Sequence, residues 1–407
     1  DLSKKGKLSK EQKLLLSEGF LIETWVTTDF LERIAKDFEL NVYRPGVGFN
    51  KIAEVALKFI VIPEIARRYG PKDEENTLEE EINNNYKNKG IDYIAELLGV
   101  DRSDLVKEIE EMLRSLLLGG FEESNGMSLG GHTLEKDGLL AAVVVSEAAI
   151  YAKKHDTNLA RILVSLYCQY GYYATVNFPL VLDKVTGNTD KENIMDSLKI
   201  IAEAIDKKTL EEPIIVDGKR VVKVEFSNDP TVVIGPKDKG YKFIFEDGSF
   251  IITRPSGTEG KIRFYGQSKV DASYVNEENI DIVKEIAQAT IIKLDEGFQE
   301  LAVHQLLLKG NKALSEALSD NSKKSSAKLA KHYYEIAKAI FEGLEKIQSE
   351  RRANLPKVIV EAINQRKSFI DSELVKIRMR VNICQKVLEE KEVSVSLKKL
   401  TEPYGLE

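Results

Sequence analysis

The chain has 407 residues, which is enough for two or three domains with a substantial core. Its 59 basic and 66 acidic residues give a net charge of -7, and no Lys/Arg run is interleaved with aromatic residues, so composition argues against a nucleic-acid-binding protein. Two isolated cysteines argue against a disulfide framework or a zinc cluster and favour a reducing, cytoplasmic compartment.

The longest apolar run, Leu139–Tyr151, contains Glu147 and is too short to cross a bilayer. We therefore expect no membrane span and interpret this run as a buried helix. No signal peptide is visible, although the chain begins at Asp1 without a methionine. Residues 1–19 are rich in lysine without a clear period, and we expect only a leading segment there.

A strand–helix–strand pattern opens the first predicted domain. Leu21–Val26 is the first strand, the apolar residues of 30–40 recur at helical spacing, and residues 42–43 begin the second strand. Either Thr28 or Asp29 is the expected N-cap of the helix. This spacing predicts a βαβ unit, whose ligands usually bind in loops at strand ends.

The stretch Gly46–Ile52 is rich in glycine and opens a further helix. Its glycines either form a tight turn alone or let the backbone approach a ligand, and both interpretations stay open. From Pro71 to about residue 118 the sequence is acidic and helical, which is typical of an elaboration added to a domain.

Polar residues are dense in Phe121–Gly126 and again in residues 130–138, just before the apolar run. Such residues are costly to hold near a core unless they face a cleft. The carboxylate of Glu122 accepts hydrogen bonds while the hydroxyl of Ser124 can donate, a combination suited to the paired hydroxyls of a sugar. We refer to Phe121–Gly126 as the sugar loop.

His132 and Lys136 follow the sugar loop and can donate to a phosphate or move a proton. Taken alone, a histidine is equally consistent with a structural role. The surrounding polar cluster favours the functional interpretation.

The polar stretch at residues 186–188 predicts a domain boundary. A helix over residues 189–206, several short strands and a closing helix over about 279–294 then predict an α+β domain. Within it, Tyr241–Glu246 and Ser249–Thr253 flank Asp247-Gly248, which predicts a β-hairpin.

The hairpin leads into Arg254–Tyr265, which we call the phosphate loop. It offers hydroxyls on Ser256 and Thr258, a glycine between them at Gly257, and guanidinium groups on Arg254 and Arg263. Phosphate oxygens require several N–H and O–H donors together with an Arg fork. The loop contains no nucleophile paired with a base, so we interpret it as binding rather than catalytic.

The last hundred residues show the pattern of long helices instead of alternating helices and strands. Apolar residues from Leu329 to Ile347 keep a three-four spacing, and a second long helix is predicted from about residue 357 to 390. We expect the apolar stripe to pack against a partner helix or another subunit. Tyr333 and Tyr334 are interpreted as core or interface residues rather than as ligand contacts.

Three stretches together resemble the alpha-D-phosphohexomutase family, most of all its phosphoglucomutase and phosphomannomutase branch, over roughly residues 20–295. The phosphate loop is similar to the phosphate-binding loop of the family's last domain, with Gly260 at the place of the usual proline. The sugar loop with Lys136-Asp137-Gly138 resembles the sugar-binding loop of the third domain, where the family's glutamate and serine fall on Glu122 and Ser124.

The stretch Gly46–Ile52 is similar to the Gly-Phe-Lys loop of the family's third domain. Asn50 stands at the place of the family's lysine, and Lys51 comes one residue later. On this resemblance Gly48 and Lys51 are further candidates for substrate binding.

The resemblance implies a mutase. In the family, a phosphoserine of the first domain passes its phosphoryl group to a hexose phosphate, and an aspartate loop of the second domain holds Mg²⁺. The sugar bisphosphate then reorients, so that the 1- and 6-phosphate isomers interconvert. The sequence shows no serine loop of that type and no Asp-x-Asp-x-Asp run, so we expect the Mg²⁺ ligands outside this chain.

We therefore predict a phosphoglucomutase-like intramolecular phosphotransferase of carbohydrate metabolism, in which this chain supplies the sugar- and phosphate-binding half. Arg254, Ser256, Gly257, Thr258 and Arg263 would hold the non-reacting phosphate. Glu122 and Ser124 would bind sugar hydroxyls, while His132 and Lys136 would be the catalytic proton donors or acceptors. The expected partners are a hexose phosphate, upstream phosphoserine and metal-loop domains, and a second copy through the helical tail.

The predicted fold is an α/β domain of βαβ type with a mixed sheet, then a small α+β domain with an antiparallel sheet, then an α-helical extension. The predicted boundaries are 1–19 for the leading segment, 20–186 for the third-domain-like part, 187–300 for the fourth-domain-like part and 301–407 for the extension. The alternative function is a non-catalytic phosphosugar-binding or assembly protein that uses the extension for interaction.

Overall fold

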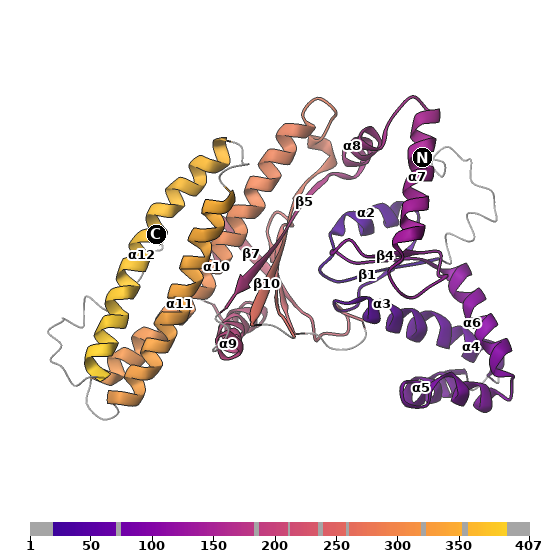
Figure 1. Ribbon diagram of the computed structural model, residues 1–407, viewed down its shortest axis with the longest axis horizontal. Helices are drawn as coiled ribbons and strands as arrows, with labels where there is room; N and C mark the ends of the chain where they lie inside the picture. Colours follow the sequence, from indigo (N-terminus) through magenta and orange to yellow (C-terminus); the bar gives the residue numbers. More distant parts are fainter. Residues whose placement is uncertain are drawn as a thin grey trace. The chain divides into compact units, whose positions relative to one another are not determined.

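The computed structural model describes residues 19–70, 75–182, 187–210, 212–234, 239–257, 260–318, 323–351 and 357–388. The chain forms two compact units (Figure 1). Unit 1 comprises Asp1–Tyr173, Phe226–Lys239 and Val270–Ile280, and unit 2 comprises Ala174–Glu225, Gly240–Lys269 and Asp281–Glu407.

Unit 1 contains a four-stranded mixed sheet. Its strands are β1 (Phe20–Glu23), β2 (Asn41–Tyr43), β3 (Leu117–Phe121) and β4 (Met127–Leu129). They lie in the order β2-β1-β3-β4, with β1 parallel to both of its neighbours and β4 antiparallel to β3. The βαβ unit predicted from the sequence is therefore confirmed.

Unit 1 also contains helices, several of which pack on this sheet. They are α2 (Asp29–Asp37), α3 (Phe49–Ala56), the π-helix η1 (Leu57–Val61), α4 (Ile62–Tyr69), α5 (Glu75–Leu98), α6 (Arg102–Leu116), α7 (Gly138–Lys154), α8 (Leu159–Tyr170) and the short 3₁₀ helix η2 (Ala272–Tyr274). Thr28, one of the two predicted caps, accepts a hydrogen bond from the N–H of Phe30 at the start of α2. Such a cap fixes where the helix begins.

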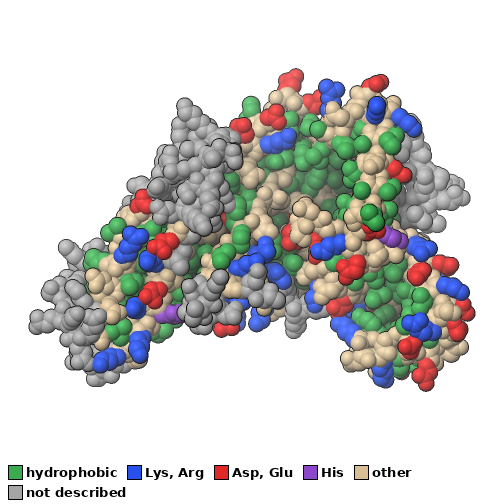
Figure 2. Space-filling view, in the orientation of Figure 1, with side chains coloured by type: hydrophobic (Ala, Val, Ile, Leu, Met, Phe, Trp, Pro, Cys, Tyr) green, Lys and Arg blue, Asp and Glu red, His purple; other side chains and the backbone are tan. Residues whose placement is uncertain are grey.

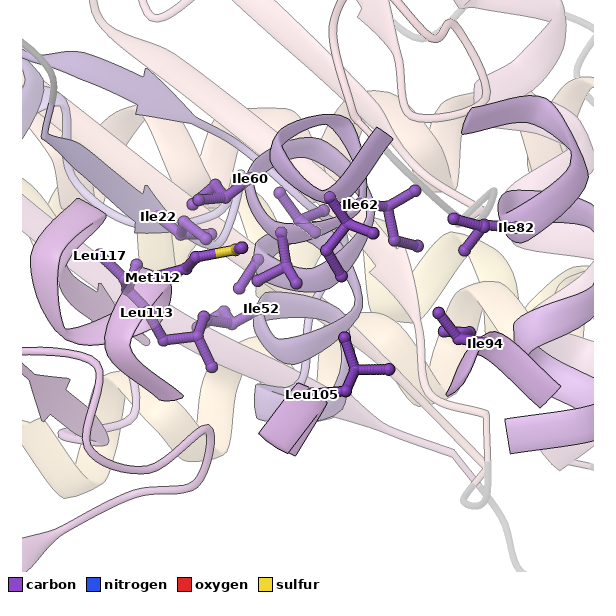
Figure 3. Packing of buried hydrophobic residues seen from close by; sticks show 14 of the residues in the cluster. Ile22, Ile52, Ile60, Ile62, Ile82, Ile94, Leu105, Met112, Leu113 and Leu117 are labelled. Carbon is purple, nitrogen blue, oxygen red and sulfur yellow. The ribbon is translucent and has the colours of Figure 1, made fainter. Parts of the chain in front are cut away.

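The core of unit 1 lies between the sheet and α3 to α6. Figure 3 shows Ile22 of β1, Ile52 of α3 and Met112 of α6 among the residues that meet there. All three side chains are buried. Removing this apolar surface from water is the main force that holds these helices on the sheet.

Helix α7 corrects the prediction of a buried helix. Leu139 is 84% exposed, and other large apolar side chains of the helix are exposed with it: Val143, Val144, Val145, Ile150 and Tyr151. Figure 2 shows apolar side chains gathered along this helix. Within unit 1 the helix contacts β4 and α8, and because it is apolar on all sides these neighbours leave much of it uncovered. Among the helices of the described residues, none has the length and hydropathy needed to cross a bilayer.

Unit 2 is built around a six-stranded sheet. Its strands are β5 (Tyr172–Val181), β6 (Ile215–Val216), β7 (Lys219–Phe226), β8 (Tyr241–Phe245), β9 (Phe250–Pro255) and β10 (Lys261–Val270), in the order β5-β10-β9-β8-β7-β6. The pairs β6–β7, β8–β9 and β9–β10 are antiparallel. At the turn between β8 and β9, Gly248 has a φ of 80° and the Asp247 carboxylate accepts from the N–H of Ser249. The predicted hairpin is confirmed.

Among its described residues, unit 2 also has four long helices: α9 (Gly187–Asp206), α10 (Ile280–Leu318), α11 (Lys323–Arg351) and α12 (Lys357–Leu388). In the extension, α11 and α12 lie side by side, and Ile336 and Ile340 of the predicted stripe are buried while Leu329 stays exposed (Figure 1). Tyr334 is fully buried. The predicted fold class is confirmed. The predicted domain boundaries stay a prediction. The one placed at residue 300 falls within α10, which continues without a break to Leu318.

Candidate functional site

The sugar loop connects β3 to β4 through a tight turn. The N–H of Glu122 donates to the carbonyl of Gly126 over 2.8 Å, and Asn125 takes the left-handed conformation with a φ of 64°. This geometry holds the loop at the end of the sheet in unit 1. Parallel strand ends are where ligands of such sheets commonly bind.

Glu122, Ser124 and Lys136 form one hydrogen-bonded group. The Nζ of Lys136 lies 2.9 Å from Oε2 of Glu122, and the hydroxyl of Ser124 donates to the same oxygen over 3.3 Å. The Glu122 side chain is only 4% exposed, so the ammonium offsets the cost of burying its charge. The hydrogen bond to Glu122 raises the pKa of Lys136 and keeps it cationic. The structure thus brings these three predicted residues together.

Gly126 makes this close packing feasible. A Cβ atom at this position would lie 2.7 Å from Cδ of Lys136 and 2.9 Å from Oε2 of Glu122. Any larger residue at position 126 therefore displaces the lysine, the glutamate or both.

His132 bonds to other residues than Glu122, Ser124 and Lys136. Its Nδ1 is 3.0 Å from the carbonyl oxygen of Leu129, so this nitrogen carries a proton, and its Nε2 is 2.6 Å from Oδ2 of Asp137. The hydrogen bond to Asp137 raises the pKa of His132. The N–H of Leu140 and then His132 lower the pKa of Asp137, which also caps α7. His132 is thus tied to the start of α7.

A second carboxylate of the sugar loop, Glu123, was not predicted from the sequence. The buried hydroxyl of Thr24 donates to its Oε2 over 3.1 Å, and the N–H of Thr24 donates to the carbonyl of Phe121. Because the Thr24 hydroxyl has one proton, its 2.9 Å contact with the Thr27 hydroxyl makes Thr27 the donor there. These bonds anchor the loop to the end of β1.

Gly48 and Lys51 lie at the start of α3. Gly48 has a φ of 121°, and a Cβ there would come within 2.5 Å of the Asn50 side chain, so the turn itself requires glycine. The N–H of Lys51 donates to the carbonyl of Gly48 over 2.9 Å, and its side chain is partly exposed. A role of Gly48 and Lys51 in substrate binding stays a prediction.

Arg44, just after β2, belongs to an ionic cluster around the buried Glu23 that sequence patterns did not reveal. The guanidinium of Arg44 lies 2.8 Å from Glu23, 2.9 Å from Asp29 and 2.9 Å from Glu32. Burial raises the pKa of Glu23 to about 7, against the opposing effect of Arg44. The cluster ties the end of β1 to α2 and leaves Arg44 fully engaged within the protein.

The phosphate loop connects β9 to β10 in unit 2. Arg254 and Arg263 are directly opposite each other in this antiparallel pair, so both side chains lie on the same face of the sheet. The N–H of Ser256 donates to the carbonyl of Lys261 over 2.9 Å and closes the base of the loop, where Gly257 is exposed. Thr258 lies outside the described residues.

Three further contacts support the phosphate loop. The N–H of Leu182 after β5 donates to the carbonyl of Gly260 over 2.9 Å, and Nη1 of Arg263 is 3.5 Å from Oδ1 of Asn177. From α9, the Nζ of Lys191 donates to the carbonyl oxygen of Ser256 over 2.8 Å. Lys191 carried no signal in the sequence, because its partner is 65 residues away.

Residues 106–170 match the family model described as phosphoglucomutase/phosphomannomutase, alpha/beta/alpha domain III. This segment runs from α6 to α8 and contains the sugar loop, His132 and Lys136. Residues 106–170 are thus similar to a phosphoglucomutase/phosphomannomutase domain. The roles of the individual site residues stay a prediction.

Relatives of the chain include a glucose bisphosphate synthase, a phosphoglucomutase and a phosphomannomutase. It is 30% identical to human glucose 1,6-bisphosphate synthase over 158 residues, covering 37% of this chain and 25% of the relative. It is 25% identical to a phosphoglucomutase of Staphylococcus saprophyticus over 289 residues, covering 67% of this chain and 46% of that protein. A phosphomannomutase of Mycoplasma pneumoniae is 22% identical over 257 residues, covering 63% and 34%. The chain therefore spans between a quarter and about half the length of these curated relatives.

A solved structure of the exocytosis-sensitive phosphoprotein pp63/parafusin, a phosphoglucomutase from Paramecium in an open form, is also similar. It has a TM-score of 0.40 and 19% identity, covering 70% of this chain and 37% of that chain.

The Mg²⁺ that the family implies finds no fitting ligand set in the part of the chain that the structure describes. No group of three or more His, Cys, Asp and Glu side chains lies together there in a way that could hold a metal ion.

Proposed function

We propose that the chain supplies the sugar- and phosphate-binding half of a phosphoglucomutase-like enzyme that interconverts the 1- and 6-phosphates of a hexose. The observation that carries this proposal is the hydrogen-bonded group of Glu122, Ser124 and Lys136 inside the segment that matches domain III. The names of the relatives, phosphoglucomutase and phosphomannomutase, support a hexose phosphate as the substrate.

At the sugar end, the Glu122 carboxylate accepts from ring hydroxyls, and Ser124 turns its hydroxyl toward the ligand. Lys136, whose pKa is raised by Glu122, is suited to act as a fixed cation beside a phosphate oxygen. His132 is the better proton donor near neutral pH, since its raised pKa starts from an ordinary value of 6.5. To transfer a proton from Nε2, His132 must first break its hydrogen bond to Asp137.

At the phosphate end, Arg254 and Arg263 would hold the non-reacting phosphate. Like charges directly opposite in a β pair repel each other, and an anion between them relieves this repulsion. Guanidinium groups bind phosphate through charge-assisted, often bidentate hydrogen bonds. Ser256, Gly257 and Thr258 supply the remaining donors in this proposal.

The transferred phosphoryl group and its metal would come from partner domains. We assign the phosphoserine and the Mg²⁺ loop to upstream phosphohexomutase domains, because the chain spans only 25% to 46% of its curated relatives. The exposed apolar residues of α7, such as Leu139 and Val143, are a surface of the kind that packs against another domain. The proposed location is the cytoplasm, which the two isolated cysteines of the sequence favour.

Calorimetry with phosphorylated and free sugar tests the phosphate loop. If Arg254 and Arg263 bind phosphate, replacing either by Ala should weaken glucose 6-phosphate binding by roughly 1.5–3 kcal/mol, the worth of a hydrogen bond to a charged group. Weak binding of free glucose should be unchanged. Arg220→Ala is the matched control, since Arg220 is an exposed arginine of the same sheet that pairs with Glu246. Equal losses for both sugars would contradict the assignment.

A further inference from the structure

One side of α9 carries polar residues that meet the helical extension. Asp190, Asn193 and Ser197 recur at a spacing of three and four, so they lie on one face of the helix. Asp190 is 7% exposed and Ser197 is fully buried. Buried polar groups are costly unless they are paired, so their partners matter for how this helix is held.

Those partners come from α10 and α11. The Nε2 of His332 lies 3.1 Å from Nδ2 of Asn193 and 3.5 Å from Oδ1 of Asp190. One helical turn further on, the Nζ of Lys309 donates to the hydroxyl of Ser197 over 3.0 Å. Both partners lie beyond residue 300, in the part of the chain that follows the stretch resembling the phosphohexomutase family.

Contacts between α10, α11 and α12 hold the extension together where these partners lie. The hydroxyl of Tyr334 donates to Oδ1 of Asn311 over 2.6 Å, and the Tyr334 ring packs on Gly310, where a Cβ would come within 2.9 Å of it. The Nζ of Lys331 donates to Gln385 of α12 over 2.9 Å. His332 therefore projects from a fixed part of α11.

The residue next to Asp190 on α9 is Lys191, whose Nζ donates to the carbonyl of Ser256. A continuous set of contacts thus runs from His332 through the first turns of α9 to the phosphate loop. All of these residues belong to unit 2.

We propose that the helical extension positions the phosphate loop: His332 fixes the start of α9, and Lys191 on α9 fixes the Ser256 carbonyl. Lys191 and His332 are positioning residues, since they act through the loop rather than on the substrate. The inference rests on the proposed function for the claim that phosphate binds there. It gives the extension a role within its own chain rather than only in assembly.

The test uses the full chain and two readouts. Lys191→Met keeps the length of the side chain and removes its charge, and His332→Ala removes the contacts to Asp190 and Asn193. Hydrogen exchange should rise in the peptide around Ser256 in both variants, while the core of β9 around Ile251 stays protected. Calorimetry with inorganic phosphate should show binding about tenfold weaker for Lys191→Met, the loss expected if the worth of the Lys191–Ser256 bond, a hydrogen bond from a charged group, goes into holding the loop in its binding geometry.

Two further variants separate positioning from general damage. Lys191→Arg retains a donor and should restore binding, whereas Lys199→Met, which removes an exposed lysine of the same helix, should change nothing. The double variant Lys191→Met/His332→Ala should bind no more weakly than Lys191→Met alone, because both changes break one line of contacts. Additive losses, or unchanged exchange around Ser256, would overturn the proposal.

The exchange readout also separates this inference from the proposed function. If the unmodified chain binds neither phosphate nor glucose 6-phosphate, the proposed function fails. The exchange data then still decide whether Lys191 and His332 hold the loop, because that measurement uses no ligand.

Discussion

Gly126 is the residue on which the geometry of the sugar loop depends most directly. Its missing side chain lets Lys136 lie against Glu122, and the lysine is the flexible member of that contact. The backbone of Gly126 is not in the left-handed region, so alanine fits its conformation. A single methyl group is therefore a local probe of the Glu122–Lys136 pair.

We expect Gly126→Ala to push Lys136 away from Glu122 and to weaken glucose 6-phosphate binding several-fold. The melting temperature should also fall, because Gly126 is buried and displacing Lys136 leaves the buried Glu122 carboxylate without its cation. Gly138→Ala is the control, because nothing lies near a Cβ built there. Calorimetry and thermal unfolding of both variants check this. Unchanged affinity in Gly126→Ala would remove the pair from the proposed substrate contacts.

The His132–Asp137 contact makes a prediction about pH. The raised pKa of His132 adds stability that is present below its ordinary value of 6.5 and is lost as pH rises through the folded value. The lowered pKa of Asp137 adds stability that is present above its ordinary 3.8 and is lost as pH falls through the folded value. The contact therefore contributes most between these two transitions.

Asp137→Asn should lower the pKa of His132 toward its ordinary value, as followed by NMR titration of the ring. Asparagine is also a good N-cap, so α7 should keep its start. Glu135→Gln removes a neighbouring carboxylate of the same segment and should leave the titration unchanged. A His132 pKa that is equal in the chain and in Asp137→Asn would show that the contact does not form in solution.

At the scale of elements, the sequence predicted those turns and helix starts that depend on contacts between residues close in the chain. Asp247-Gly248 predicted the hairpin of β8 and β9, and the pair Thr28 and Asp29 predicted the start of α2, because a turn and a cap are made by residues close in sequence. The exposure of α7 was mispredicted, since burial depends on which elements cover a helix. Glu123 and Lys191 were missed because their partners, Thr24 and Ser256, are 99 and 65 residues away.

The anchor between β1 and the sugar loop leads to a prediction about stability. Thr24→Val should destabilise unit 1 by about 1–3 kcal/mol, because it leaves the Glu123 carboxylate without its buried donor. Thr24→Ser keeps the hydroxyl and should cost less. Urea unfolding followed by tryptophan fluorescence checks this, since the chain has one tryptophan, the buried Trp25 next to Thr24. Equal stability of the valine and serine variants would show that the bond contributes nothing.

At the scale of the whole molecule, binding a sugar phosphate and transferring its phosphoryl group require different chemical groups. The described residues offer groups that can bind a sugar and a phosphate, and they offer no cluster of metal ligands. Phosphoryl transfer depends on neutralising the charge of the transferred group, commonly with a metal. In the proposed function, the carrier and the metal belong to upstream phosphohexomutase domains, and α7 is the surface proposed to pack against them.

The last prediction concerns turnover. With Mg²⁺ and a bisphosphate primer, the chain alone should not convert glucose 1-phosphate in a coupled dehydrogenase assay, and adding the upstream half of a phosphohexomutase should produce turnover. Val143→Asp, at a side chain 54% exposed on α7, should abolish this rescue and leave phosphate binding intact, whereas Glu147→Gln on the same helix should not. Turnover by the chain alone would reveal a phosphoryl carrier within these 407 residues. Absence of turnover in every mixture would instead favour a phosphosugar-binding protein without catalysis.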